Sequence, residues 1–430
     1  MARYPETPTV LEGFPLGMDN RAPEADLDSQ ALRLAKNVDV LTSGNTRTRN
    51  GYAAVSGASG GHSAWSHPLL PYGFYVSSAG NLVLVRDDLS RTDLVGVNPL
   101  LPMSYTLFDG RVYYANGVDQ GYVKDGVHYR WTLPTPSSPL VVYSAGGSAP
   151  AGRYQFALTA LFNDGEESGA SRVTHLETSA AGSIEIGPIP NNPAVTKYKI
   201  YMTYPDGKEL FFLAEVAPGT SSLVLSSRPE LQYPLRQLHM TPFPPFPRLA
   251  TFKSYILGAQ GRELFFSDPS QASLIDRQHA QVRFDDDITH IAPVEDGVYV
   301  GTGYQTLWLA GDDPTRWAKV TKDPVYGITP MYSSFHPPTE VFADGRLAEG
   351  IVACWMSTET QLCVGRPNGS IQRITGERLA ISTFGQCSMY YREYSGHAQI
   401  VALLDDIRIS TTAKERSLVV TNLDRNSVSQ

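Results

Sequence analysis

Acidic clusters are the residues of this sequence whose types and spacing could support chemistry. The densest is Asp285-Asp286-Asp287, with His290 close behind, and paired aspartates stand at 87–88, 312–313 and 405–406. Paired carboxylates can act as acid and base on a glycosidic bond. Three adjacent aspartates could instead give oxygen ligands to calcium. Aspartate is also favoured in turns between strands, and turn capping is the interpretation that we favour.

Motifs of the common catalytic and cofactor sites are largely missing. The sequence has no His-Glu-x-x-His, no Cys-x-x-Cys, no phosphate loop ending in Gly-Lys-Ser/Thr, and no Ser-x-Asp-x-Gly-x-Thr-Trp box of sialidase blades. Gly301-Thr302-Gly303 is a fragment of a dinucleotide fingerprint, but Thr306 occupies the place of the third glycine. We therefore expect no cofactor and no catalytic residues.

Aromatic residues and cysteines have two possible uses each. The aromatic residues could stack on carbohydrate, but in strands they more often fill the space between sheets. They are Trp65, Tyr72, Phe74, Trp131, Tyr304, Trp308, Trp317, Tyr390, Tyr391 and Tyr394. The three cysteines, Cys354, Cys363 and Cys387, lack zinc spacing and are too few for a disulfide framework, so we expect buried thiols.

Composition indicates a globular chain rich in β-structure. Of the 430 residues, 42% are hydrophobic and 18% charged, and 23 tyrosines and 16 phenylalanines accompany 37 glycines and 31 prolines. The net charge of −8 argues against holding DNA by neutralising its phosphates, which needs clustered Lys and Arg. The start, Met1 to Glu6, has no apolar region typical of a secretory signal, so we expect synthesis in a reducing cytoplasm. No window approaches the roughly 18 apolar residues of a membrane span.

Turn signals along the chain indicate that it consists of short strands. Asp-Gly occurs at 109, 125, 164, 206, 296 and 344, and Asn-Gly at 50, 116 and 368. Such pairs supply the positive φ angles of tight hairpins. Helical periodicity is nearly absent, and only Asp28 to Lys36 could hold two helical turns. The sequence predicts an all-β protein.

The region 136–228 has the pattern of one β-sandwich. Alternating residues at 151–160 turn at 163–168, and a second hairpin joins 197–202 to 210–214. These pairs resemble a fibronectin type III module, with its "Y.y.vtal...GeES" strand pair followed by "y.iYr...g...fl.ev". Proline-rich segments on both sides, at 133–139 and 242–247, are expected to act as stiff linkers.

The flanking regions, 1–135 and 229–430, have a different pattern of apolar residues. Short apolar strands recur there, for example at 82–85, 111–115, 297–301 and 398–402. The later ones are spaced at roughly forty to fifty residues, which is typical of propeller blades. We predict a β-propeller of five or six blades with the sandwich inserted between blades. Two stacked sandwiches are the alternative. The run Ser417 to Thr421 is expected to close the ring by joining an N-terminal blade.

The segment Leu27 to Tyr52 carries a family resemblance. Its Asn37-Val38-Asp39, Ser43-Gly44, Arg47, Arg49 and Asn50-Gly51-Tyr52 are similar to the "arNvd...sG..r.R.Gy" opening of phage tail nozzle, or packaged-DNA stabilisation, proteins. The resemblance implies a β-propeller tail protein, without catalysis, that assembles as a homohexameric ring below the portal and adaptor. In the virion, such a ring lines and closes the DNA exit channel until infection, and it also meets tail fibres or spikes.

Three sets of residues are candidates for roles in such a ring. Asp285, Asp286 and Asp287 are expected to face the bore, where negative charge would let DNA slide. Arg47 and Arg49 alternate on one strand and are expected to dock on a neighbouring tail protein. Phe243 and Phe246 lie in a proline-rich segment and could contact another subunit or pack within their own domain. A receptor- or glycan-binding tail-tip protein and a propeller glycoside hydrolase remain the alternative functions.

Overall fold

The computed structural model describes most of the chain, and all statements below concern the described residues. These are 13–23, 25–35, 38–41, 43–49, 60–131, 133–162, 165–330, 332–338, 350–375, 378–379, 386–394, 397–405 and 416–422.

Six antiparallel sheets form the main body, and the strands of each are paired in chain order. We number these sheets as blades 1 to 6. Blades 1 to 3 consist of β3 (His62–Ser66), β4 (Tyr72–Val76), β5 (Asn81–Arg86) and β6 (Arg91–Gly96); β7 (Ser104–Phe108), β8 (Arg111–Ala115), β9 (Gln120–Lys124) and β10 (Val127–Tyr129); and β19 (Arg248–Phe252), β20 (Tyr255–Gln260), β21 (Glu263–Phe266) and β23 (Gln281–Arg283).

Blades 4 and 5 also have four strands each, and three strands of blade 6 are described. They consist of β24 (Ile288–Val294), β25 (Gly297–Thr302), β26 (Thr306–Ala310) and β27 (Ala318–Asp323); β28 (Ser334–Phe335), β29 (Ala353–Met356), β30 (Leu362–Gly365) and β31 (Ile371–Arg373); and β32 (Gln386–Tyr394), β33 (His397–Asp405) and β34 (Arg416–Asn422). A single 3₁₀ turn, η1 (Pro314–Arg316), precedes β27.

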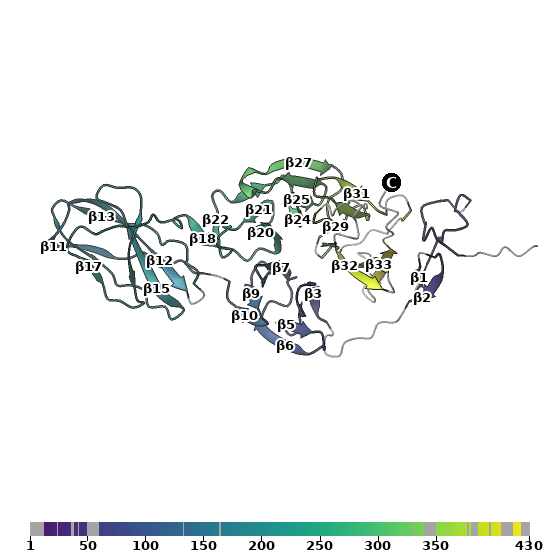
Figure 1. The fold of residues 1–430 in the computed structure, drawn as a ribbon, viewed down its shortest axis with the longest axis horizontal. Helices are drawn as coiled ribbons and strands as arrows, with labels where there is room; N and C mark the ends of the chain where they lie inside the picture. The colour runs from purple at the N-terminus through teal and green to yellow at the C-terminus, as the bar shows by residue number, and fades with distance from the viewer. Residues whose placement is uncertain are drawn as a thin grey trace, which may run out of the picture.

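The blades are arranged as a ring, so the fold is a β-propeller, as predicted, and it has six blades where five or six were expected (Figure 1). The first strands of successive blades contact one another, as β7 does β19, β19 does β24, and β28 does β32. These first strands are therefore the innermost strands of the ring. Buried apolar residues fill the spaces between blades: one cluster joins blades 1 and 2, a large one joins blades 2 to 4, and two others join blades 4 to 5 and 5 to 6.

The β-sandwich is inserted between blades 2 and 3, and it projects at one end of the molecule (Figure 1). Its seven strands lie between Val141 and Leu225. One sheet has the order β11 (Val141–Ala149), β14 (Gly182–Ile186), β17 (Leu223–Leu225), and the other has β13 (Thr174–Thr178), β12 (Gly152–Phe162), β15 (Val195–Met202), β16 (Phe211–Val216). The chain returns to the propeller through β18 (Met240–Pro242), which pairs with β22 (Leu274–Asp276).

Several Asp-Gly pairs make the predicted hairpin turns. Asp109 and Gly110, between β7 and β8, have φ angles of 48° and 68°. Asp125 and Gly126, between β9 and β10, have 51° and 77°. Both central residues of such two-residue turns need positive φ, which explains why this dipeptide recurs in the chain.

Two expectations about the ends of the chain are wrong. Residues 28–35 form turns and an isolated bridge, not a helix, because the Leu32 amide donates to the Gly17 carbonyl outside the segment. The strand at Ser417–Thr421 exists as part of β34, but it pairs with β33 inside blade 6 and not with an N-terminal blade. Of the predicted turns, Asn50-Gly51, Asp164 and Asp344-Gly345 lie outside the described residues. The described part of the chain contains no helix long and apolar enough to span a membrane.

Candidate functional site

Side-chain hydrogen bonds connect the innermost strands of neighbouring blades. The Ser104 hydroxyl accepts from the Leu249 amide at 2.9 Å, and the Thr251 hydroxyl donates to the Leu107 carbonyl at 2.9 Å. Arg248 Nε donates to the Thr289 carbonyl at 2.7 Å. These residues are Ser, Thr and Arg on strands β7, β19 and β24, so the centre of the ring is polar although the spaces between blades are apolar.

Four basic side chains from four blades interact electrostatically around this centre. They are His67 after β3, Arg248 on β19, His290 on β24 and His336 after β28. His290 Nε2 is hydrogen-bonded to the Ser334 hydroxyl, and His336 Nε2 donates to the Pro293 carbonyl at 2.7 Å. Burial, followed by the charges of Arg248 and His336, lowers the pKa of His290 to about 3. The ring of His290 is therefore neutral at pH 7.

Tyr332 connects the later blades to the earlier ones. It lies in the connection between blades 4 and 5, and its hydroxyl donates to the Met103 carbonyl, just before β7, at 2.5 Å. Its own carbonyl accepts from the Met389 amide of β32. Burial raises the pKa of Tyr332 to about 12, and its hydrogen bonds to Ser63 and Met103 act against this rise. The side chain and the backbone of this one residue thus connect blades 1, 2 and 6.

The predicted acidic cluster lies on the connection that leads into innermost strand β24. Asp285 and Asp287 are exposed, and Asp286 is half-buried. The Asp287 carboxylate is 3.7 Å from Arg262 Nε, and its charge also acts on Arg248. Asp286 accepts a hydrogen bond from the Asp287 amide, as expected of a turn. No group of three or more His, Cys, Asp or Glu able to hold a metal ion occurs in the described part of the chain.

The two arginines of the N-terminal signature have different surroundings. Arg47 is exposed on β2 (Thr46–Thr48), which pairs with β1 (Val38–Val40). Arg49 Nε forms an ion pair with Asp39 Oδ1 at 2.9 Å, and these side chains are 15% and 4% exposed. Arg49 is thus paired within its own chain, and its docking on a neighbouring tail protein stays a prediction.

Phe243 and Phe246 are not available for contact with another subunit. Each is only 1% exposed. Phe243 stacks on Trp131 with ring centroids 4.9 Å apart, and Phe246 stacks on Phe265 at 5.0 Å. The prediction of a subunit contact is wrong, and packing within the chain, which was the alternative, is what the structure has. Both rings belong to the apolar cluster that joins blades 2 to 4.

The other sequence predictions fare differently. The three cysteines are buried free thiols, as expected. Phe74, Trp131 and Trp308 are buried between blades, whereas Tyr304 is 74% exposed.

Sequence reasoning missed that Gly57-Ala58-Ser59-Gly60-Gly61 matches the pattern of a Gly-x-Ser-x-Gly nucleophile motif. Residues 57–59 lie outside the described residues, so the structure gives no geometry for it.

Two adjacent glutamates join the sandwich to the propeller. Glu166 Oε1 pairs with Arg111 Nη1 of blade 2 at 3.1 Å, and its Oε2 accepts from the Ser273 hydroxyl at 2.5 Å. The Glu167 carbonyl accepts from Gln271 Nε2 at 2.5 Å. These residues belong to the "GeES" turn of the fibronectin-like pattern. Sequence inspection assigned the orientation of the sandwich to proline linkers and missed this contact.

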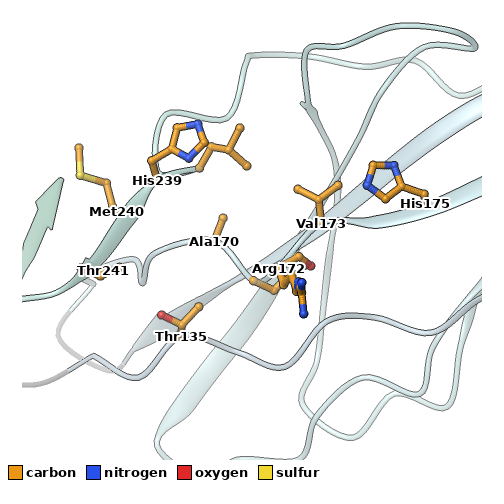
Figure 2. Close-up of a pocket in the computed structure, with 10 residues that line it drawn as sticks. Thr135, Ala170, Arg172, Val173, His175, His239, Met240 and Thr241 are labelled. Carbon is orange, nitrogen blue, oxygen red and sulfur yellow. Dashed lines mark hydrogen bonds between the residues drawn. The ribbon is translucent and has the colours of Figure 1, made fainter. Parts of the chain in front are cut away.

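A pocket of about 460 Å³ lies where the sandwich meets the returning chain. Figure 2 shows His175 and His239 on opposite sides, with Ala170 and Val173 between them. Its ten lining residues include Arg172 and no carboxylate. The pocket is therefore basic, in contrast to the acidic chain as a whole.

Comparisons with known proteins find structural similarity at low sequence identity. No family model matches the sequence, and no curated protein does. Among solved structures, streptogramin B lyase is similar with 9% identity and a TM-score of 0.35, over 85% of this chain and 96% of that one. The WD40 domain of Neurospora crassa Pan2 has 9% identity and a TM-score of 0.29, over 77% of this chain and 82% of that one. The Dos1 propeller has 11% identity and a TM-score of 0.27, over 78% of this chain and 87% of that one.

Proposed function

We propose that this chain is a structural protein of a phage tail, several copies of which form a ring that lines and closes the DNA exit channel until infection. The observation that carries the proposal is the behaviour of the N-terminal signature. Asp39 and Arg49 of that signature form a largely buried ion pair across the β1–β2 hairpin. The residues that carry the family resemblance are thus the residues that build one local structure.

Gly44 of the signature has an equally specific role. Its φ angle is 83°, and a Cβ atom there would lie 2.8 Å from Pro15 and 2.9 Å from the Phe14 amide. The Gly44 carbonyl accepts a hydrogen bond from that amide at 2.7 Å. Only glycine meets these requirements, which supports the signature as a structural motif shared with nozzle proteins.

The shape of the molecule also suits a ring component. The β1–β2 hairpin and the sandwich lie at opposite ends, with the propeller between them (Figure 1). Residues 16–21 bond to Arg378 and Leu379, so the N-terminal segment is anchored on the connection between blades 5 and 6. Contacts between unlike ends of neighbouring copies would be heterologous, and heterologous contacts generate rings where the rotation between copies closes.

In this proposal, the acidic turn Asp285–Asp287 faces the bore of the assembled ring, where its charge repels DNA phosphates. Arg47 remains the candidate for docking on portal- or adaptor-side tail proteins. Immunogold labelling of purified tails with antibodies against the sandwich tests the assignment. Label at the distal end of the tail is expected, and virions without label or without the chain by mass spectrometry would contradict it.

The junction pocket favours a second candidate, a receptor- or glycan-binding protein at the tail tip. Its volume of about 460 Å³ is within the range of ligand sites, about 300–1,000 Å³. Binding of the full-length protein to a defined sugar on a glycan array would favour this function, provided that Arg172→Gln weakens the binding.

A further inference from the structure

The innermost strands carry a charge opposite to that of the whole chain. The protein has a net charge of −8. The described residues of β3, β7, β19, β24, β28 and β32 nevertheless include two arginines, Arg248 and Arg392, and one carboxylate, Glu393. Glu393 accepts a hydrogen bond from the Tyr391 hydroxyl at 2.9 Å. The centre of the propeller is thus basic, although the protein as a whole is acidic.

Arg248 lacks a counter-ion among the described residues. Its Nε donates to the Thr289 carbonyl, but its guanidinium is in no ion pair there, and the side chain is only partly exposed. The charge of Asp287 does act on Arg248, yet the carboxylate of Asp287 is 3.7 Å from Arg262 Nε. Arginine stays protonated in proteins, so this charge cannot be removed by losing a proton. A partly buried cation that is in no ion pair is costly, and a bound anion would lower that cost.

Besides Asp287, the neighbours of Arg248 are the Thr289 carbonyl and the side chain of His290. His290, from the next blade, is close enough for the two side chains to affect each other electrostatically. Its Nε2 is bonded to the Ser334 hydroxyl, and its Nδ1 makes no hydrogen bond within the described part of the chain. His336 adds a third basic group from blade 5. Arg248 and His290 are half-buried, and His336 is exposed.

We propose that Arg248 and His290, at the centre of the propeller, bind a small tetrahedral oxyanion of the phosphate or sulfate class. The guanidinium presents paired N–H donors that match such an oxyanion. His290 is neutral when the site is empty and gains a second N–H donor if it takes up a proton with the anion. The charged or titratable groups that act on His290 are Arg248 and His336, and Asp287 acts on Arg248. The proposed site lies within one chain and does not depend on the assembly of several copies. Phosphate binding by a monomer would therefore support the site even if the proposed function failed.

Calorimetry and thermal unfolding of the full-length protein test the site. Inorganic phosphate and sulfate are titrated against potassium chloride at equal ionic strength. We expect a saturable rise in Tm with both oxyanions and at least tenfold weaker binding by Arg248→Gln. Arg316→Gln is the matched control, since Arg316 is an exposed arginine that pairs with Asp313 outside the site, and it should bind as the wild type does.

Arg248→Lys keeps the charge but loses the planar pair of donors, so it should bind with intermediate affinity; it also replaces Arg248→Gln if that variant does not fold. A Tm rise no larger than that caused by chloride would overturn the proposal. Equal binding by the Arg248 variants and the wild type would also overturn it. So would loss of binding in Arg316→Gln, because the removal of any exposed positive charge would then weaken binding.

Discussion

Glu167 should be the most sensitive charged residue of the sandwich. Its Oε1 accepts from the Thr159 hydroxyl at 2.5 Å and the Tyr201 hydroxyl at 2.9 Å, and its Oε2 is 2.7 Å from Lys199 Nζ. Glu167 and Lys199 are 12% and 16% exposed. Burial lowers the pKa of Lys199, but the hydrogen bond and charge of Glu167 outweigh burial and raise it. The ammonium group therefore depends on this one carboxylate.

Glu167→Gln keeps the shape and the two hydroxyl contacts but leaves Lys199 without its partner. Breaking a buried ion pair costs about 3–5 kcal/mol. Partial exposure and the retained contacts reduce our expectation to about 2–3 kcal/mol. Because the five tryptophans, at 65, 131, 308, 317 and 355, all lie outside the sandwich, tryptophan fluorescence reports on the propeller. We expect that signal to change little.

Hydrogen exchange with mass spectrometry measures the effect where it arises. Exchange in β12 and β15 should be about 30- to 150-fold faster in Glu167→Gln. This factor corresponds to the expected loss of about 2–3 kcal/mol in the free energy of unfolding. Glu215→Gln is the control, because Glu215 pairs with Lys197 in the same sheet but these side chains are 36% and 55% exposed. Its effect should be below about 1 kcal/mol.

Glu167→Gln combined with Lys199→Met should recover much of the lost stability, because no unpaired charge remains. Unchanged exchange in Glu167→Gln would refute the reasoning, as would a double variant less stable than the single one.

Three further predictions concern the propeller. Phe246→Ala should cost about 3–5 kcal/mol and lower the Tm of the full-length protein, since the ring is buried; an unchanged Tm would show that it is not. Burial alone would raise the pKa of Asp323, but hydrogen bonds, of which the one from Arg373 is the largest, hold it below its usual range. The stability that Asp323 contributes is thus present above about pH 4 and lost as pH falls further, so denaturation curves of Asp323→Asn should converge with the wild type in acid. Burial raises the pKa of all three cysteine thiols, to about 12 for Cys363 and Cys387, so a thiol reagent should react only after unfolding; rapid labelling of the native protein would contradict this.

The strands and turns could be predicted from the sequence because they depend on local patterns. Asp109-Gly110 and Asp125-Gly126 make hairpin turns whatever the rest of the chain does, and alternating apolar residues mark the strands. The spacing of these strands limited the blade number to five or six. The short helix at Asp28–Lys36 was wrong because so short a segment follows its tertiary hydrogen bonds more than its own preference.

The errors about side chains have one physical cause. Prolines around Phe243 and Phe246 indicate an irregular segment, but not whether it is covered by other parts of the chain. One signal was available: Gly258 lies within strand β20, and a Cβ atom there would come within 2.1 Å of the Phe246 ring. The cluster of Arg248, His290 and His336 could not be predicted, because it forms only when the ring brings three blades together.

The oligomeric state of the full-length protein tests the central claim most directly. Negative-stain electron microscopy and native mass measurement of the recombinant chain, alone and mixed with purified tails, would determine it. We predict closed rings, hexameric as the family resemblance implies, that occupy the end of the tail. A protein that stays monomeric at every concentration and never joins the tails would contradict the account.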